Sequence, residues 1–240
     1  MRAISWFSCG AASAVTTVLH AIRWGDKHEA VYCRVEEEHE DNLRFLNEFT
    51  KVFGIPVKII RNEKYKGSIY EVFRSRGFIK NQYGAPCTMV LKKDMRKEYQ
   101  QIEDVQAFGY TSEEQDRADR FIDANNEVTE SFPLLDNNIS KRDCLKLISN
   151  SGIELPVMYK LGYQNNNCIG CVKGGMGYWN KIRKDFPLQF KRMSEIEREV
   201  GFAINKDKSG QIFLDNLEPH RGRFVEDSPG DCGFTCEMKK

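Results

Sequence analysis

Cysteines are the residues of this chain whose type and spacing most directly suggest chemistry, and four of the eight form two close pairs. One pair is Cys168 with Cys171, and the other is Cys232 with Cys236. In a reducing compartment, paired cysteines more often bind a metal or exchange electrons than form structural disulfides. Glycines inside and after the first pair let backbone N–H groups turn toward the sulfurs. The pairs predict a four-thiolate site for zinc or an iron–sulfur cluster, with a redox dithiol as the alternative.

A second candidate site is the N-terminal stretch, where an apolar run at residues 3–7 leads into a loop of small residues at 8–13. The run predicts a buried strand, and the helical spacing of apolar residues from Ala14 onward predicts a helix after the loop. This order of elements points backbone N–H groups at an anion. Gly10 allows close approach, and Ser8 and Ser13 add hydroxyl groups. We expect phosphate or sulfate binding, with a βα turn that binds nothing as the alternative.

Two arginines follow the buried run at residues 105–109, in a polar segment rich in glutamate. Open α/β sheets bind ligands at the carboxyl ends of their strands. Arg117 and Arg120 lie three residues apart, so both can lie on one helical face and hold an oxyanion. Alternatively, they pair with the acidic residues just ahead of them.

An acidic cluster at residues 36–41 follows the second predicted strand. One interpretation is a solvated loop whose carboxylates favour the N-terminus of the next helix. The other is that one carboxylate meets a ribose hydroxyl.

The elements that must position these residues alternate between strand and helix along most of the chain. This alternation predicts an α/β fold with a doubly wound, mostly parallel sheet covered on both faces. We expect one domain over residues 1–165, and a cysteine-rich C-terminal region with helices and a small hairpin over residues 166–240. A capping box at Ser140 and an interrupted helix over residues 179–200 are also expected.

The overall composition limits the partners. A net charge of +1 argues against a protein that wraps duplex nucleic acid, so any such contact should be local. No stretch approaches the length of a membrane-spanning helix, so no membrane partner is expected. Polar residues interrupt the N-terminal apolar run, which therefore reads as a strand rather than a signal peptide. We expect a cytoplasmic location.

Three segments together resemble one known family. The loop Ser8–Val15 resembles a Ser-x-Gly-x-x-x-Ala-Val pattern, Gly109–Ala118 resembles a Gly…Glu…Arg-Ala segment, and Phe132–Leu135 with the later Leu161–Tyr163 resembles the stretch ahead of that family's C-terminal part. The family is the phosphoadenosine-phosphosulfate (PAPS) reductases, within the PP-loop superfamily of adenine nucleotide alpha-hydrolase-like proteins. The resemblance covers roughly residues 3–172.

The resemblance implies a PP-loop/HUP-like sheet with an adenine nucleotide over the first loop. Ser8, Gly10 and Ser13 would hold phosphate or sulfate. Glu114 and Arg120 would belong to the same nucleotide site, and Arg117 would help to bind the anionic end. In this family a tail cysteine attacks the sulfate sulfur. Asp231–Phe234 is similar to that tail motif, which would make Cys232 the nucleophile and a thiol protein such as thioredoxin the reductant.

Some members of the family also carry a [4Fe–4S] cluster on a Cys-Cys pair and a Cys-x-x-Cys pair. Cys168 and Cys171 match the second pair. Cys87 matches half of the first, and threonine follows it in place of the second cysteine. A cluster would then need Cys236 or Cys232 as its fourth ligand, and a cysteine that binds metal is no longer a nucleophile.

Two further departures from the family pattern bear on the reaction. Thr235 occupies the place of the tail histidine. Ala12 and Ser13 stand where the ATP-cleaving members carry aspartate, which disfavours Mg-ATP chemistry.

Three functional hypotheses follow from these observations. The first is an oxidoreductase that binds an adenine (phospho)sulfonucleotide and reduces its sulfate by thiol attack. The second is an ATP-dependent sulfurtransferase that acts on a nucleic-acid base or a nucleotide, supported by the extra cysteines and by the basic helix from Lys181 to Arg192. The third is a non-catalytic nucleotide-binding module with a structural zinc site.

Overall fold

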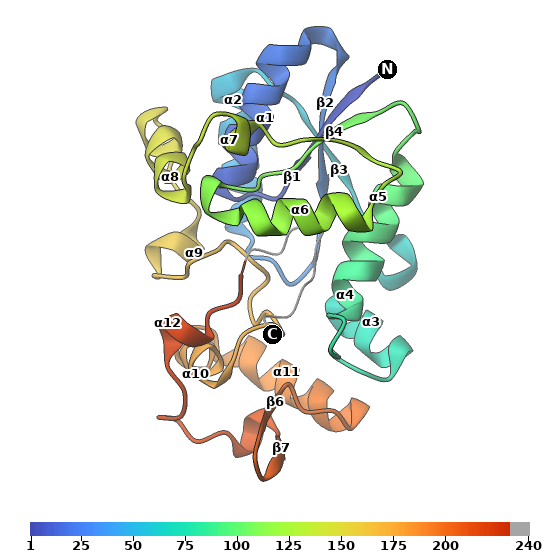
Figure 1. Cartoon of the computed structure of the whole chain (residues 1–240). Coiled ribbons are helices and arrows are strands. Elements are labelled where there is room, and N and C mark those ends of the chain that lie inside the picture. The colour runs from blue at the N-terminus through green and yellow to red at the C-terminus, as the bar shows by residue number, and fades with distance from the viewer. Residues whose placement is uncertain (231–240) are drawn as a thin grey trace. The chain divides into compact units, whose positions relative to one another are not determined.

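The computed structural model describes residues 1–230 of the chain (Figure 1). The chain divides into two compact units, and each unit is built from three segments of the sequence. The first unit comprises Met1–Arg34, Glu40–Ile60 and Arg96–Leu161, and the second comprises Val35–His39, Arg61–Met95 and the chain from Gly162 onward. The predicted domain boundary at residue 165 stays a prediction.

The first unit is a five-stranded parallel sheet in the order β3-β2-β1-β4-β5. Its strands are β1 (Ala3–Phe7), β2 (His28–Cys33), β3 (Val57–Ile60), β4 (Val105–Ala107) and β5 (Thr129–Ser131). Its helices are α1 (Ala11–Trp24), η1 (Gly25–Lys27), α2 (Asp41–Phe53), α5 (Asp94–Tyr99), η4 (Ser112–Glu114), α6 (Gln115–Ala124), α7 (Pro133–Asp136), α8 (Lys141–Asn150) and α9 (Val157–Lys160). The predicted doubly wound α/β sheet is confirmed.

Alternating side chains of β1 build cores on both faces of this sheet. Phe7 packs with Phe45 and Phe49 of α2, in a cluster that also includes residues of α1, α7 and α8. Its neighbour Trp6 points the other way and meets the ring of Tyr99 in α5. Figure 1 shows α1 and α8 on one side of the strands and α5 on the other. Helices on both faces explain why β1 is buried along its whole length.

Helices and a small hairpin make up the second unit. Their bounds are η2 (Glu63–Tyr65), α3 (Ile69–Arg76), α4 (Pro86–Thr88), η3 (Met89–Lys93), α10 (Met176–Asp185), α11 (Pro187–Val200), β6 (Asn205–Asp207), β7 (Gly210–Ile212), η5 (Leu214–Asn216) and α12 (Phe224–Asp227). The element η3 is a π-helical turn. The capping box at Ser140 is confirmed, as are a small hairpin in the C-terminal region and an interruption within the helix expected over residues 179–200, which falls at Pro187.

A buried carboxylate organises the hairpin of the second unit. Glu197 in α11 is fully buried and accepts hydrogen bonds from the backbone N–H groups of Ile204 (2.6 Å) and Leu214 (2.5 Å). Burial raises the pKa of its carboxyl to about 7, against the effect of these two donors. The Glu197 side chain thus binds the backbone just before β6 and just after β7, and so attaches both ends of the hairpin to α11.

A buried polar chain joins β1, α1 and β2 in the first unit. The Ser5 hydroxyl lies 3.1 Å from Nδ1 of His20 and 2.9 Å from Nε2 of His28. One hydroxyl can donate to only one ring, so the other ring must donate to it, and both rings fit as neutral imidazoles. Burial lowers the pKa of His20 to about 3 and that of His28 to about 4.

We predict that this chain of three residues makes the fold labile to acid. An unfolded histidine takes up a proton near pH 6.5, whereas the folded rings resist protonation until the pH falls to about 4 and 3. Stability is therefore complete above pH 6.5 and is lost as the pH falls, by up to about 1.4 kcal/mol per pH unit for each ring. Urea unfolding between pH 6.5 and 4 measures how steeply the free energy of unfolding falls with pH. The His28→Gln variant should lose the contribution of one of the two rings to this pH dependence. Equal slopes for the two proteins would contradict the prediction.

Candidate functional site

The N-terminal loop is held together by one hydroxyl group. Ser13 Oγ accepts hydrogen bonds from Ser8 N and Ser8 Oγ, both at 3.0 Å, and donates to the carbonyl of Gly10 at 2.9 Å. Three of the predicted site residues therefore lie together in a single turn. Because the Ser13 proton is used within the loop, this side chain orders the backbone rather than serving as a donor to a ligand.

Donors for a ligand come from the start of α1. The first intrahelical bond runs from Ala14 N to Gly10 O, so the N–H groups of residues 11–13 have no partner within the helix. α1 has 14 residues and no acidic residue in its first turn, so its dipole favours an anion there. The phenol oxygen of Tyr159 lies 3.3 Å from Ala11 N. Tyr159 thus stands at the place where an anion would meet the loop.

The segment after β4 lies against this loop. A Cβ on Gly109 would come within 3.1 Å of Ser13 N and 3.2 Å of Ser13 Cα, so only glycine fits without displacing the backbone. Two residues on, Thr111 and Glu114 form a capping box that starts the helical stretch leading into α6. The sequence motif around Gly109 is thereby explained by close packing and helix initiation.

Arg117 and Glu114, both predicted site residues, form an ion pair with each other. The Arg117 guanidinium also lies over the ring of Tyr110, 5.2 Å from its centroid. This pairing is the structural alternative that the sequence left open. A guanidinium has five N–H donors, however, so Arg117 can keep Glu114 and still bind an oxyanion. Arg120 lies on an exposed part of α6.

Three cysteines are core residues of the first unit. Cys9, Cys33 and Cys144 are at most 5% exposed, and burial raises the pKa of Cys144 to about 12. Cys9 has a left-handed backbone with φ of 56°, and it fills the core beneath the loop. These thiols are inert, because a reactive cysteine must be both exposed and ionised.

The cysteine loop, residues 168–175 of the second unit, is shaped by two aromatic residues of α10. The Tyr178 hydroxyl accepts a hydrogen bond from Cys171 N at 2.9 Å. Gly170 adopts φ of +75°, and a Cβ there would lie 2.8 Å from the Trp179 ring. Tyr178 and Trp179 are themselves buried. The turn between Cys168 and Cys171 therefore has little room to change its conformation.

Three of the predicted metal ligands lie among the described residues. Within residues 1–230, no group of three or more Cys, His, Asp or Glu side chains is arranged to hold a metal ion. Cys168 and Cys171 offer two thiolates in one turn, and Cys87 lies half-buried in α4. Cys232 and Cys236 fall outside the described residues. The four-cysteine ligand set stays a prediction.

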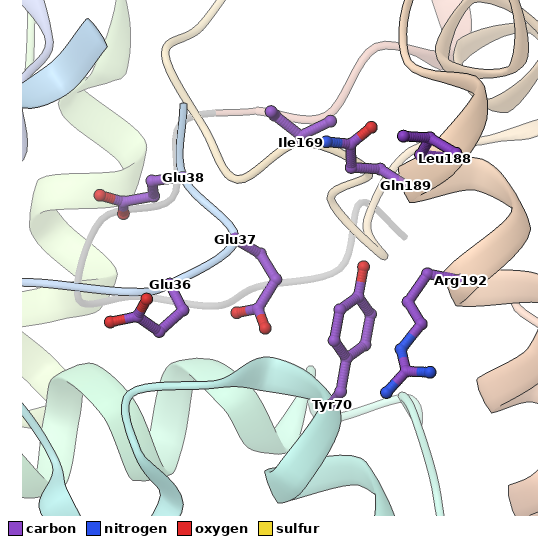
Figure 2. Close-up of a pocket in the computed structure, with 8 residues that line it drawn as sticks. All are labelled: Glu36, Glu37, Glu38, Tyr70, Ile169, Leu188, Gln189 and Arg192. Carbon is purple, nitrogen blue, oxygen red and sulfur yellow. The ribbon is translucent and has the colours of Figure 1, made fainter. Parts of the chain in front are cut away.

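A cavity of about 350 Å³ lies in the second unit beside the cysteine loop (Figure 2). Glu36, Glu37, Glu38, Tyr70, Ile169, Leu188, Gln189 and Arg192 line it. The acidic cluster is partly structural, because Glu37 accepts hydrogen bonds from Ser68 Oγ (2.5 Å) and Ile69 N (2.9 Å), and Glu38 pairs with Lys92 at 3.4 Å. Burial raises the pKa of Glu37 despite these bonds. The expectation of a wholly solvated loop is therefore wrong for Glu38, which is buried.

Nothing in the sequence indicates the roles of Tyr159 and Tyr178. Tyr159 is far along the chain from Ala11, which it contacts, and Tyr178 lies in α10, outside the loop that holds Cys171. A tyrosine in an apolar helical pattern gives no sign of where its hydroxyl points. A signal did exist for a third feature, the run Asn165–Asn167 directly ahead of Cys168. All three asparagines are buried, which is unusual for this residue type.

We predict that Gly170→Ala destabilises the protein by about 2–5 kcal/mol, combining left-handed strain with a clash against Trp179. Gly201→Ala is the matched control, because Gly201 has φ of +71° with nothing near its Cβ position. The control should lose only about 1–2 kcal/mol from strain. Urea unfolding measures both, and equal losses would show that the ring does not shape the turn.

Comparison with known proteins identifies the chain's relatives. One solved structure similar to it is the U34-tRNA thiolase NcsA from Methanococcus maripaludis with its [4Fe–4S] cluster, at 14% identity and a TM-score of 0.43, over 87% of this chain and 74% of that one. No curated protein sequence matches the chain. Among the described residues, no helix is both long enough and apolar enough to cross a membrane.

The sequence model of the phosphoadenosine phosphosulfate reductase domain matches residues 2–174. This span contains the β1–α1 loop, the segment after β4 and the Cys168–Cys171 turn. The resemblance noted from the motifs is thereby confirmed, and the chain belongs to the phosphoadenosine phosphosulfate reductase domain family.

Proposed function

We propose that the chain is a sulfonucleotide reductase-like enzyme, which binds an adenine (phospho)sulfonucleotide over its N-terminal loop and reduces the sulfate by thiol attack. The observation that carries the proposal is the start of α1, whose first backbone N–H groups have no partner within the helix and whose first turn holds no acidic residue. Such a site binds an anion directly, whereas magnesium-bound ATP would call for a carboxylate to hold the metal. Family membership supports the same reading.

Each residue of the loop has a distinct role in this proposal. Gly10 lets the anion approach, since a Cβ there would crowd the Tyr159 hydroxyl at 3.3 Å. Ser13 fixes the turn through Ser8 and the Gly10 carbonyl. The phosphate or sulfate would take the N–H of Ala11 in place of the Tyr159 hydroxyl. Arg117 would donate to the anionic end while keeping Glu114, with Arg120 nearby on the same helix.

The proposed reduction has two stages, thiol attack on the nucleotide and release of sulfite by a dithiol. A Cys232 thiolate attacks the sulfate sulfur, so that an S–S bond forms and the bond from that sulfur to the phosphate oxygen breaks. The nucleotide leaves with the electron pair, and the cysteine carries the sulfur as a thiosulfonate. A dithiol protein such as thioredoxin then attacks the cysteine sulfur and releases sulfite. Its second thiol resolves the mixed disulfide, so the dithiol supplies two electrons and Cys232 returns to a thiol.

A second candidate is ATP-dependent sulfur transfer to a nucleic-acid base or a nucleotide. The thiol pair in the cysteine loop supports it, because one thiol could carry sulfur as a persulfide and the neighbouring thiol could release that sulfur by forming a disulfide with it. The basic helix supports it less than its composition alone suggests. Lys181 pairs with Asp185, and Arg183 donates to the carbonyls of Leu214 and Leu217, so two of its cations serve the fold.

We predict that ³⁵S-labelled adenosine 5′-phosphosulfate or its 3′-phospho form transfers label to Cys232 of the full chain, and that thioredoxin releases it as sulfite. Cys232→Ser should abolish labelling. Ser13→Ala removes three hydrogen bonds from the loop and should weaken nucleotide binding about ten- to hundredfold. Ser149→Ala, an exposed serine of the same unit, is the control.

Failure of both nucleotides to label any cysteine would overturn the reductase proposal. Release of AMP from ATP in the presence of RNA or DNA would then favour sulfur transfer. Tightly bound zinc without either reaction would leave the non-catalytic module.

A further inference from the structure

Asp41, the last member of the acidic cluster at residues 36–41, begins α2 and serves a distant segment of the first unit. Its Oδ2 accepts a hydrogen bond from the N–H of Val157 at 2.9 Å, at the first residue of α9. The N–H groups in the first turn of a helix have no acceptor within that helix, and a negative charge is favourable there. Asp41 therefore stabilises the start of α9.

Arg44, one turn further along α2, holds the backbone just ahead of α9. Its Nη1 donates to the carbonyl of Glu154 at 3.0 Å, and its Nη2 donates to that of Leu155 at 3.4 Å. The guanidinium is itself held by Asp41, at 2.6 and 2.9 Å, and by Glu48, at 2.8 Å. A planar guanidinium fixed in this way loses little further freedom when it binds the carbonyls. The chain that enters α9 is thus fastened to α2.

α9 depends on such contacts for its position. It has only four residues, too few to form a stable helix without tertiary support. Tyr159 is its third residue, and the Tyr159 phenol oxygen accepts a hydrogen bond from Ala11 N at 3.3 Å. A Cβ on Gly10 would also lie 3.3 Å from that oxygen. α2 therefore determines where the Tyr159 hydroxyl meets the N-terminal loop.

The hydrogen bond between Tyr159 and Ala11 is suited to exchange. Ala11 is 1% exposed, so its N–H needs an acceptor when no ligand is bound. The distance of 3.3 Å exceeds the usual value of about 2.9–3.0 Å, which makes this a weak bond. Tyr159 is only half-buried, so its ring is less confined than a core side chain. An anion can therefore take over the Ala11 N–H at little cost to the fold.

We propose that Tyr159, held in place by Asp41 and Arg44, is an internal competitor whose hydroxyl occupies the Ala11 N–H until a sulfate or phosphate group displaces it. This inference rests on the proposed function, because it says what the anion must replace at that site. Only molecules in which the hydroxyl has left can bind the anion there, so the contact lowers the apparent affinity by that fraction. Asp41 and Arg44 are positioning residues, because they act through α9.

The first test follows the Ala11 amide in the full chain without any ligand. Protein labelled with ¹⁵N-alanine is transferred to heavy water, and NMR measures the rate at which each alanine amide exchanges. Tyr159→Phe keeps the ring and removes only the hydroxyl, so the Ala11 amide should exchange faster by about threefold or more. The Ala14 amide, which donates to the Gly10 carbonyl, should keep its rate.

The second test measures the binding of inorganic sulfate and of adenosine 5′-phosphosulfate by calorimetry. Tyr159→Phe should bind both about three- to tenfold more tightly, because the anion no longer has to break a hydrogen bond. Arg44→Ala releases α9 and should also tighten binding. The double variant should bind no more tightly than Tyr159→Phe, because both changes remove the same contact. Where Arg44→Ala fails to fold, Asp41→Asn replaces it, with the same expected direction.

Two control variants change similar groups of the first unit that do not contact α9. Tyr99→Phe removes a hydroxyl that donates to Glu29 at 2.6 Å. Arg2→Ala matches Arg44→Ala, because both side chains are 29% exposed and both join a carboxylate to a backbone carbonyl. Both controls should leave anion binding and the Ala11 exchange rate unchanged. An effect of lost stability alone would appear in the controls as well.

Unchanged exchange of Ala11 in Tyr159→Phe would overturn the proposal. Unchanged or weaker anion binding would do so too, and weaker binding would show that the hydroxyl donates to the anion. Tightening in Tyr159→Phe with unchanged binding in the α2 variant would overturn the part assigned to Asp41 and Arg44.

The two anions separate this inference from the proposed function. If sulfate binds and its binding tightens in Tyr159→Phe while the nucleotide does not bind, the internal competitor stands and the sulfonucleotide proposal falls. Failure of both anions to bind the wild type and Tyr159→Phe would overturn both.

Discussion

The Ser13 hydroxyl is the contact on which the conformation of the N-terminal loop depends. It ties the residue before the turn, Ser8, to the carbonyl of Gly10 within the turn, and so fixes the start of α1 relative to the end of β1. Gly109 packs against the same backbone and leaves no room for the loop to shift toward β4. The N–H groups of residues 11–13 are thereby preorganised, which lowers the cost of ordering a binding loop around an anion.

A related constraint governs the second unit, where residues 162–175 lie outside the named helices and strands. Their backbone polar groups still need partners, and side chains of other segments supply them. Tyr178 serves Cys171 N, and Lys80 donates to the carbonyl of Val172 at 2.8 Å. The carboxylates Glu197 and Asp227 do the same for the hairpin and the tail. Polar side chains therefore take the place of regular secondary structure in holding these segments.

Much of the fold could be predicted because it follows from local pattern. The apolar runs at residues 3–7 and 105–109 predicted β1 and β4, and the capping box at Ser140 predicted the start of α8, whereas α10 begins at Met176, ahead of the helix expected from residue 179. β5 escaped prediction, since Thr129–Ser131 is short and polar and forms a strand only because β4 provides an edge. The candidate site was predictable only in part. Ser8, Gly10 and Ser13 are close in sequence, whereas Tyr159 reaches the loop from the far end of the same unit. The division into two units could not be predicted either, because each unit combines three separate segments of the sequence and no local pattern shows which segments belong together.

The fate of the charged residues bears on the kind of ligand this protein can take. Two of the basic side chains in the helical stretch from Lys181 to Arg192 interact with aromatic rings of the second unit. Lys181 lies over the Tyr163 ring, and Arg183 lies over the Phe190 ring. In the first unit, Arg96 is buried against Phe108 and Phe121 and donates to Asn125, near the C-terminal end of α6. Cations used in this way stabilise helix ends and aromatic packing rather than attract a polyanion. The start of α1, by contrast, presents backbone N–H groups without an acidic residue in its first turn, an arrangement that suits one small anionic group better than an extended backbone of phosphates.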